Sequence, residues 1–179
     1  MLMNADDAVL LLVDLQERLV PAVHDGDEVV ARAVRLAEAA ALLGVPVLAT
    51  EQVPDKLGPT VAALSGHPHL VTPKSRFAAD AAGLFPPGRS EIVVAGVEAH
   101  VCVLQTVLEL LDGTGTRGAG RRVYVAADAV GSRSPADRDL ALARARSAGA
   151  GIVSSEMVLF EWLRDAAHPR FREVQKLLR

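Results

Sequence analysis

The stretch "EIVVAGVEAHVCVLQTVLELLD" (residues 91–112) combines the two patterns that decide the fold of this chain. Its first seven residues, 91–97, form a short apolar run rich in β-branched residues, which predicts a buried strand. From 101 to 112, Val and Leu recur at helical spacing, which predicts a helix. A strand that feeds directly into a helix is the repeating unit of a parallel sheet with crossover helices, so this stretch predicts an α/β fold.

The same alternation continues along the rest of the chain. Further strands are expected over residues 8–14, 45–50, 69–74, 121–128 and 150–155. Helices are expected over residues 28–44 and 135–149, with two more short helices between residues 156 and 178. Because no repeat or low-complexity linker interrupts this pattern, we expect residues 1–179 to form a single domain.

The composition limits the classes of function. Nineteen basic and twenty-two acidic residues give a formal charge of −3, which offers no electrostatic reason to expect nucleic acid or an anionic membrane as a partner. The apolar run near the N-terminus lacks a basic flank, and Asp14 interrupts it too soon for a membrane span. The single cysteine, Cys102, cannot form an internal disulfide. We therefore expect a soluble protein of a reducing compartment such as the cytoplasm.

The segment "GTGTRG" (113–118) matches the dinucleotide-binding pattern G-x-G-x-x-G. That pattern binds a pyrophosphate only between a strand and the helix that the strand feeds. Here the glycines follow a predicted helix and precede a predicted strand. We interpret the segment as a flexible surface connection and expect no cofactor.

Polar residues lie at the carboxyl ends of several predicted strands, where open parallel sheets bind ligands. Asp14 ends the first strand, Lys74 ends the third, and Cys102 follows the fourth within a few residues. These residues are a base, a cation and a nucleophile by type. Each also has a structural interpretation. Asp14 can be a cap or a surface carboxylate, and so can Asp128 at the end of the fifth predicted strand. Lys74 can be a solvated strand end. Cys102 can be a small buried hydrophobic residue.

If the three side chains converge, the thiol of Cys102 is expected to be acidic. A thiol in the first turn of a helix lies at the positive end of the helix dipole, and a nearby ammonium lowers its pKa further. The turn "GVEAHVC" (96–102) also offers backbone N–H groups to a tetrahedral oxyanion. We therefore expect a pKa well below the ordinary thiol value of about 8.5.

The histidines are weaker candidates for chemistry. His100 lies two residues before Cys102, a spacing at which the side chains of a helix do not face each other, so Asp14 is preferred as the base. His67 and His69 can point to one side of an extended segment. Two imidazoles without a third ligand nearby make a weak metal site.

Along nearly its whole length, the chain resembles the isochorismatase-like cysteine hydrolase superfamily. The matching stretches are "LLLVDLQERL" (10–19), "TEQVPDKLGPT" (50–60), "PKSRF" (73–77) and "AGVEAHVCVLQT" (95–106). Two more, residues 128–150 and 166–178, resemble the subgroup of isochorismatase domain-containing proteins. Several motifs in the same order make this resemblance much more specific than any one of them.

The resemblance implies a Rossmann-like, three-layer α/β/α fold with a six-stranded, mostly parallel sheet. It implies a catalytic triad in which Asp14 is the base, Lys74 orients and stabilises charge, and Cys102 is the nucleophile. It also implies a cis peptide bond between Val97 and Glu98, which aims the Glu98 N–H beside the Cys102 N–H as an oxyanion hole. Assembly into a homo-oligomer is expected on the same ground.

The stretch "TEQVPDKLGPT" (50–60) has no histidine where nicotinamidases of the superfamily carry metal ligands. We therefore expect neither a metal nor nicotinamidase activity. The isochorismatase reaction does not require a cysteine in all members, so the retained Cys102 favours acyl transfer to water. The expected activity is metal-independent hydrolysis of a small amide or related C–N or acyl substrate through a covalent thioester.

Glu51, Gln52 and Phe77 are expected on loops that face the substrate, and Gln16 is expected to brace the loop after Asp14. Two other functions remain open at this point. The chain can be a non-catalytic interaction protein on a hydrolase scaffold, or a redox-active protein whose single cysteine needs an external resolving thiol.

Overall fold

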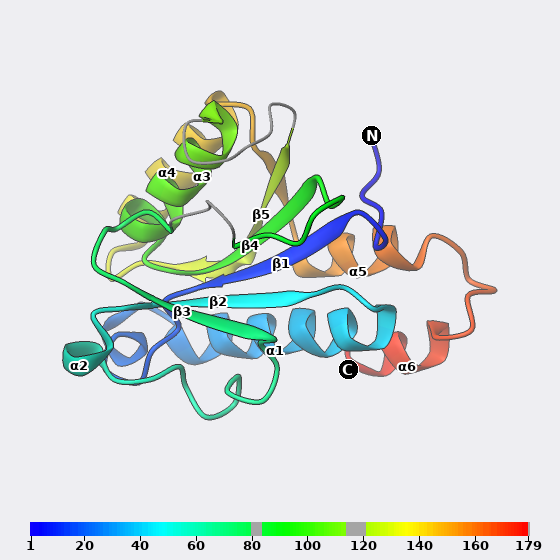
Figure 1. Ribbon diagram of the computed structural model, residues 1–179, viewed down its shortest axis with the longest axis horizontal. Coiled ribbons are helices and arrows are strands. Elements are labelled where there is room, and N and C mark those ends of the chain that lie inside the picture. The colour runs from blue at the N-terminus through cyan, green and yellow to red at the C-terminus, as the bar shows by residue number, and fades with distance from the viewer. Residues whose placement is uncertain (80–83, 114–120, 179) are drawn as a thin grey trace.

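A six-stranded sheet forms the centre of the molecule in a computed structural model that describes residues 1–79, 84–113 and 121–178 (Figure 1). Its strand order is β3-β2-β1-β4-β5-β6, and every neighbouring pair is parallel. The strands are β1 (Ala8–Val13), β2 (Val47–Gln52), β3 (Leu70–Lys74), β4 (Glu91–Val97), β5 (Arg122–Gly131) and β6 (Gly151–Val153). The chain starts in the middle of the sheet at β1 and reverses direction after β3, so the carboxyl ends of β1 and β4 meet at the topological switch point.

Helices cover both faces of the sheet, as the expected three-layer α/β/α architecture requires (Figure 1). The helices packed on one face are α1 (Gly26–Leu43), α5 (Ser155–Leu163) and α6 (Phe171–Lys176). The helices on the other face are α3 (Leu104–Asp112) and α4 (Pro135–Ser147). Leu10 and Leu12 of β1 pack against the first group, whereas Leu11 and Val13 pack against the second. This alternation explains why β1 is apolar throughout, since both of its faces are buried.

Most expected elements are present with small shifts of their ends. β5 continues to Gly131, three residues beyond the expected strand, and the two tail helices are shorter than expected. Two short elements were not predicted, η1 (Val20–Ala22) and α2 (Pro54–Leu57). The predicted helix 101–112 begins earlier, as a π-helical turn η2 (Ala99–Val103) that runs into α3.

One glycine sets the close approach of β1 and β4 near the switch point. Gly96 has φ 131°, and a Cβ atom there would lie 2.1 Å from the backbone oxygen of Val13. Only glycine fits this contact and this backbone conformation. The carboxyl ends of β1 and β4, where Val13 pairs with Gly96, therefore lie close together.

No helix among the described residues is both long and apolar enough to cross a membrane. The expectation of a flexible connection at "GTGTRG" falls on residues 114–118, which lie outside the described residues.

Candidate active site

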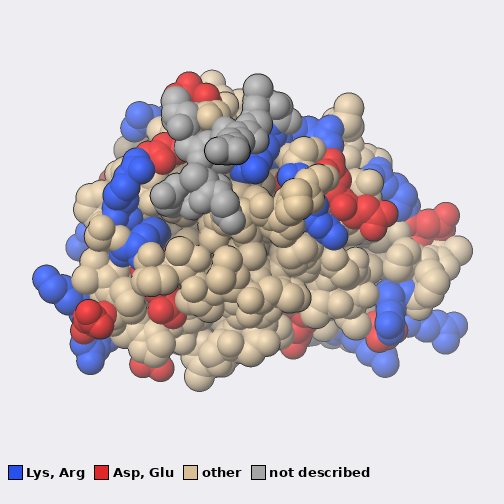
Figure 2. All heavy atoms as spheres, in the orientation of Figure 1, with Lys and Arg blue, Asp and Glu red and all other residues tan. Residues whose placement is uncertain are grey.

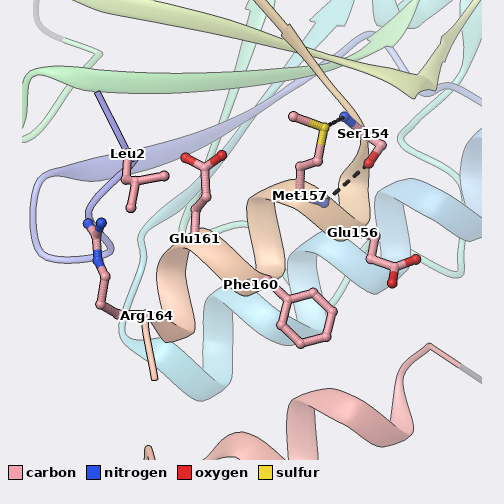
Figure 3. A pocket seen from close by; sticks show the side chains of 7 residues that line it. All are labelled: Leu2, Ser154, Glu156, Met157, Phe160, Glu161 and Arg164. Atoms are coloured by element: carbon pink, nitrogen blue, oxygen red, sulfur yellow. Dashed lines mark hydrogen bonds between the residues drawn. The ribbon is translucent and has the colours of Figure 1, made fainter. Parts of the chain in front are cut away.

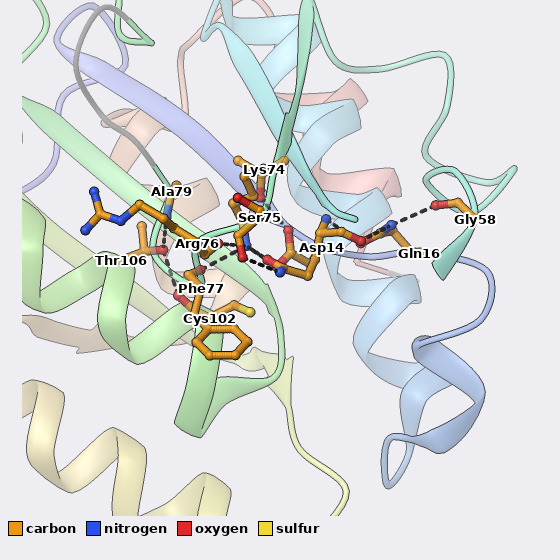
Figure 4. A network of polar contacts seen from close by, with 12 residues as sticks. Asp14, Gln16, Gly58, Lys74, Ser75, Arg76, Phe77, Ala79, Cys102 and Thr106 are labelled. Carbon is orange, nitrogen blue, oxygen red and sulfur yellow. Dashed lines mark hydrogen bonds and ion pairs between the residues drawn. The ribbon is translucent and has the colours of Figure 1, made fainter. Parts of the chain in front are cut away.

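The three predicted catalytic residues converge at the carboxyl edge of the sheet, where β1, β3 and β4 end (Figure 4). Asp14 directly follows β1 and has a left-handed backbone conformation, with φ 51°. Lys74 is the last residue of β3, and Cys102 lies in η2. The strand order alone explains the convergence, because β3, β2, β1 and β4 are consecutive neighbours in the sheet.

Asp14 and Lys74 form a buried ion pair. Lys74 Nζ lies 2.6 Å from Asp14 Oδ2, and Thr50 Oγ1 donates to Asp14 Oδ1 at 2.8 Å. The side chains of Asp14 and Lys74 are 0% and 6% exposed. Charges this deeply buried persist only when they are paired and further hydrogen-bonded, so the surroundings of both groups matter.

Lys74 is held by polar atoms on several sides. Its Nζ donates to Gln52 Oε1 at 2.7 Å and to the backbone oxygens of Phe77 and Arg76 at 2.9 and 3.3 Å. The segment after β3 therefore wraps around the ammonium group (Figure 4). The ammonium group of Lys74 is therefore fixed in one place. Lys74 is not the solvated strand end that the sequence also allowed.

Two glutamines hold the ends of β1 and β2 together. Gln16 Nε2 donates to the backbone oxygens of Gln52 and Gly58 at 3.1 and 2.7 Å, and Gln16 Oε1 accepts from the Gln52 N–H at 2.8 Å. The expectation that Gln16 braces the loop after Asp14 agrees with these contacts. Gln52 Nε2 donates in turn to the Ser75 backbone oxygen at 2.8 Å, so Gln52 links Gln16 to the segment that encloses Lys74.

The expectation that Glu51 and Gln52 lie on loops was wrong, because β2 continues to Gln52. Glu51 Oε1 accepts from both the N–H and the hydroxyl of Thr60, at 2.7 and 2.8 Å. Its carboxylate therefore fixes the segment after α2. Phe77 does lie outside a strand, is 53% exposed, and is drawn beside Cys102 in Figure 4.

Cys102 is 5% exposed, and its thiol interacts with both Asp14 and Lys74. Burial and the Asp14 carboxylate raise the pKa of Cys102 to about 12, and Lys74 offsets only part of that effect. The expectation of an acidic thiol was therefore wrong. Desolvation penalises a thiolate in this closed site more than one cation stabilises it. The Cys102 side chain is thus a neutral thiol beside a carboxylate that is already paired with a lysine.

The turn before Cys102 is fixed by Glu98 and His100. The Val97–Glu98 peptide bond is cis, at the position that the resemblance implied. The Glu98 backbone oxygen accepts from the N–H groups of Val101 and Val103 at 3.1 and 3.2 Å. His100 Nδ1 lies 3.0 Å from Ser132 Oγ. His100 thus pairs with a serine on another segment, in agreement with its low rank as a base for Cys102.

Thr106 connects Cys102 to the segment after β3. Its hydroxyl donates to the Cys102 backbone oxygen at 2.7 Å and accepts from the Ala79 N–H at 2.9 Å (Figure 4). Sequence reasoning missed Thr50, Thr106 and Ser132 as parts of the site. Thr106, four residues after Cys102, carried the one readable signal, since a helical threonine at that spacing can bond the backbone oxygen one turn earlier.

Other predicted polar residues have structural partners. His69 Nδ1 accepts from the Val47 N–H at 3.1 Å and so joins β3 to β2. Asp128 accepts from the N–H and hydroxyl of Ser155 at 2.7 and 2.6 Å, which satisfies the first turn of α5. Among the residues that the structure describes, no three His, Cys, Asp or Glu side chains gather closely enough to hold a metal ion.

A separate hollow of about 490 Å³ lies on the surface of α5 (Figure 3). The exposed apolar side chains Leu2, Met157 and Phe160 contribute to its lining. The residues of the triad are not among those that line it, so this hollow is not the candidate active site.

Comparison with known proteins places this site in a family. The isochorismatase domain model matches residues 8–84 and 84–157. Isochorismatase domain-containing protein 2A of Mus musculus is 38% identical over 178 residues, which cover 97% of this chain and 84% of the mouse protein.

Two solved structures share the fold over almost the whole chain. The structure of MAR1 ribonuclease from Caenorhabditis elegans is 34% identical, with a TM-score of 0.89 over 99% of this chain and 92% of the other. The structure of YcaC from Pseudomonas aeruginosa with hexane-2,5-diol and covalent acrylamide is 26% identical, with a TM-score of 0.82 over 98% of this chain and 91% of the other. The chain therefore belongs to the isochorismatase family of hydrolases.

Proposed function

We propose that this protein is a cysteine hydrolase that cleaves a small amide or related acyl substrate through a covalent thioester on Cys102. The observation that carries this proposal is the buried Asp14–Lys74 ion pair, which interacts with the thiol of Cys102. A buried ion pair is weak evidence for stability alone, whereas a pair that faces a nucleophile gives that nucleophile a base and a counter-charge.

Because the resting thiol is neutral, the first step needs a proton acceptor. Asp14 takes the proton from the Cys102 thiol as the sulfur–carbon bond forms at the substrate carbonyl. The Lys74 ammonium stabilises the developing negative charge on sulfur, and the N–H groups of Glu98 and Cys102 stabilise the charge on the carbonyl oxygen. Because the pKa of the thiol is raised, the attack of the Cys102 sulfur is coupled to transfer of its proton to Asp14. A thiolate does not form before the attack.

The second half returns the enzyme to its resting state. Asp14 gives its proton to the nitrogen of the leaving amine as the carbon–nitrogen bond breaks, which leaves the thioester. Asp14 then takes a proton from the attacking water, and the carbon–sulfur bond breaks to release the acid. The thiol of Cys102 regains the proton at the end.

A panel of small amides, carbamoyl compounds and thioesters, assayed with the unsubstituted chain and with Cys102→Ala, tests the proposal. Intact-protein mass spectrometry after rapid acid quenching detects the acyl adduct. We expect at least one substrate with an adduct at Cys102, and loss of turnover by at least about 10⁴-fold in Cys102→Ala, since only binding and oxyanion stabilisation remain. Turnover that survives in Cys102→Ala would overturn the proposed mechanism.

The redox alternative predicts a different response to peroxide. A redox-active thiol turns over when a reductant is supplied, whereas a hydrolase is inactivated when its thiol is oxidised. The neutral, buried thiol supports the hydrolase, because peroxide-reactive cysteines are accessible thiolates. Catalytic consumption of peroxide with added dithiothreitol would favour the redox function instead. Binding of partners with no turnover of any substrate would favour the non-catalytic scaffold.

We propose a small molecule, not nucleic acid, as the substrate. The formal charge is −3, and on the face in Figure 2 the basic side chains alternate with acidic ones around the margin. The lysine of the site is also committed to Asp14. Since one related structure is described as a ribonuclease, a labelled RNA belongs in the substrate panel. Cleavage of RNA that is lost in Cys102→Ala would overturn this choice of substrate.

We further propose that residues 1–179 act as a single domain in the cytoplasm and assemble as a homo-oligomer. The apolar hollow on α5 supports self-association, because exposed apolar patches on a monomer commonly mark interfaces (Figure 3). Light scattering of Phe160→Glu against the unsubstituted chain tests this. An unchanged mass would exclude the α5 face as the interface.

A further inference from the structure

The turn that carries Cys102 is joined to the segment after β5 by two side-chain contacts. Glu98 Oε2 accepts from the backbone N–H of Arg133 at 2.9 Å and from its guanidinium Nε at 3.0 Å. Two residues further along, His100 Nδ1 lies 3.0 Å from Ser132 Oγ. Glu98 and His100 of one segment therefore contact two consecutive residues of the other.

The burial of Glu98 is hard to explain by stability alone. Its side chain is 8% exposed, whereas that of Arg133 is 65% exposed. An ion pair with so solvated a cation contributes little, and the burial of a carboxylate is costly. The bond from the Arg133 backbone N–H to the carboxylate does not depend on a flexible side chain, and a charged acceptor makes it strong. The contact between the Glu98 carboxylate and the Arg133 N–H therefore fixes the position of Glu98 more than it stabilises the fold.

Glu98 is held from both its side chain and its backbone. Its backbone oxygen accepts from Val101 and Val103, while its carboxylate is fixed to Arg133. The Ser132 backbone oxygen accepts in turn from the His24 N–H at 3.0 Å, so the segment that receives Glu98 is itself anchored. Because the side chain and the backbone oxygen of Glu98 are both held, the direction of its N–H is fixed as well.

We propose that Glu98, Ser132 and Arg133 are positioning residues that aim the Glu98 N–H at the substrate carbonyl oxygen. The inference rests on the proposed function, in which this N–H belongs to the oxyanion hole. The pKa of the Cys102 thiol responds to Asp14 and Lys74, which lie on other elements. Loss of the Glu98 contacts should therefore weaken oxyanion binding and leave the reactivity of the thiol unchanged.

Acetaldehyde separates these two properties without a known substrate. The sulfur of Cys102 adds to its carbonyl carbon, the carbon–oxygen double bond becomes single, and the thiol proton ends on that oxygen. The hemithioacetal oxygen occupies the place of the oxyanion. Iodoacetamide instead loses iodide at a saturated carbon, and its amide carbonyl stays unchanged, so the reaction does not use the oxyanion hole. Carbon-13 NMR of labelled acetaldehyde gives the affinity of the first reaction, and mass spectrometry gives the rate of the second.

We expect Glu98→Ala to weaken hemithioacetal formation by at least about tenfold, since one oxyanion donor is worth 10²–10³ in rate in a measured hydrolase. Ser132→Ala should weaken it by a smaller factor. Glu98→Gln should restore it, because the amide oxygen accepts the same two bonds. Arg170→Ala, which removes another half-exposed ion pair, is the matched control and should change nothing. The iodoacetamide rate at Cys102 should stay constant throughout.

The inference is overturned if acetaldehyde binds Glu98→Ala as well as the unsubstituted chain, or if both reactions fall by the same factor. Circular dichroism identifies a variant that fails to fold. In that case Ser132→Ala decides the question by the same two measurements. Failure of the proposed function looks different, since the unsubstituted chain itself would then form no hemithioacetal at Cys102.

Discussion

Two groups of paired charges lie at opposite edges of the sheet, one at each end of β1. At the carboxyl ends, Asp14 follows β1 and pairs with Lys74. At the amino ends, Asp7 precedes β1, and Arg122 at the start of β5 lies between Asp7 and Glu91. Asp14 and Glu91 are both completely buried. Each group thus pairs a completely buried carboxylate with a basic side chain.

Their surroundings differ. At the amino ends, the carboxylates pair with Arg122 and also accept from backbone and hydroxyl groups. Glu91 Oε2 accepts from the Asn4 N–H at 2.7 Å, and Asp7 accepts from the N–H and hydroxyl of Ser90 at 2.8 Å each. These contacts fix the N-terminal segment to the sheet. At the carboxyl ends, the ion pair instead interacts with a thiol, whose pKa is raised by burial and by Asp14 and lowered by Lys74. A buried charge pair therefore indicates a reactive site only when a group that can react lies beside it.

The largest expected effect separates Asp7 and Asp14, the two aspartates that flank β1. Asp14→Asn should lower hydrolysis by about 10³-fold or more, because the base is lost. The same change should speed alkylation of Cys102 by iodoacetamide at pH 8 by at least about tenfold, because the carboxylate that raises the pKa of the thiol is gone. Asparagine accepts the left-handed backbone of this position. Asp7→Asn is the control and should alter neither rate.

Slower alkylation in Asp14→Asn would contradict the assignment of Asp14 as the group that keeps the thiol neutral. Equal effects of the two substitutions would remove the difference between the two ends of β1.

Lys74→Met should have the next largest effect. Removal of the ammonium leaves the Asp14 carboxylate buried without its partner, which costs about 3–5 kcal/mol in the free energy of unfolding. Alkylation of Cys102 should become slower than in the unsubstituted chain, because Lys74 lowers the pKa of the thiol. Urea unfolding and the iodoacetamide rate measure the two effects. Faster alkylation would show that Lys74 does not favour the thiolate.

Glu91→Gln examines the amino-end group in the same way. We expect a loss of about 2 kcal/mol in the free energy of unfolding, less than for Lys74→Met, because Arg122 is 36% exposed and partly solvated. The alkylation rate of Cys102 should not change, and hydrolysis should persist in the folded protein. A change in thiol reactivity would mean that the two ends of the sheet are coupled.

The smallest effect concerns the pH dependence of stability. Hydrogen bonds from Ser90 hold the pKa of Asp7 below its ordinary value of 3.8. A carboxyl whose pKa is lowered by folding stabilises the native state above pH 3.8, and this contribution disappears as the pH falls through the folded value. Asp7→Asn should therefore remove less than about 1 kcal/mol at neutral pH and nothing at the acid end. Urea unfolding from pH 2 to 6, against the unsubstituted chain, checks the sign.

The sequence by itself determined the layers of the fold. β1 is apolar throughout, and β4 is apolar after Glu91, because both faces of each strand are buried, and such runs are readable without a structure. It also determined that polar residues end these strands, and the motifs around them identified the family. Asp14, Lys74 and Cys102 could be selected because strand ends of a parallel sheet share one edge.

Only the tertiary structure decided how those residues behave. Whether Cys102 is acidic depends on the balance of desolvation and two opposing charges, which no local pattern contains. The partners of Glu98 and His100 lie more than thirty residues away, at Arg133 and Ser132. Local sequence periodicity reports which face of an element is buried. The protonation state of a buried group depends instead on distances between elements, and those distances exist only after the strands have assembled.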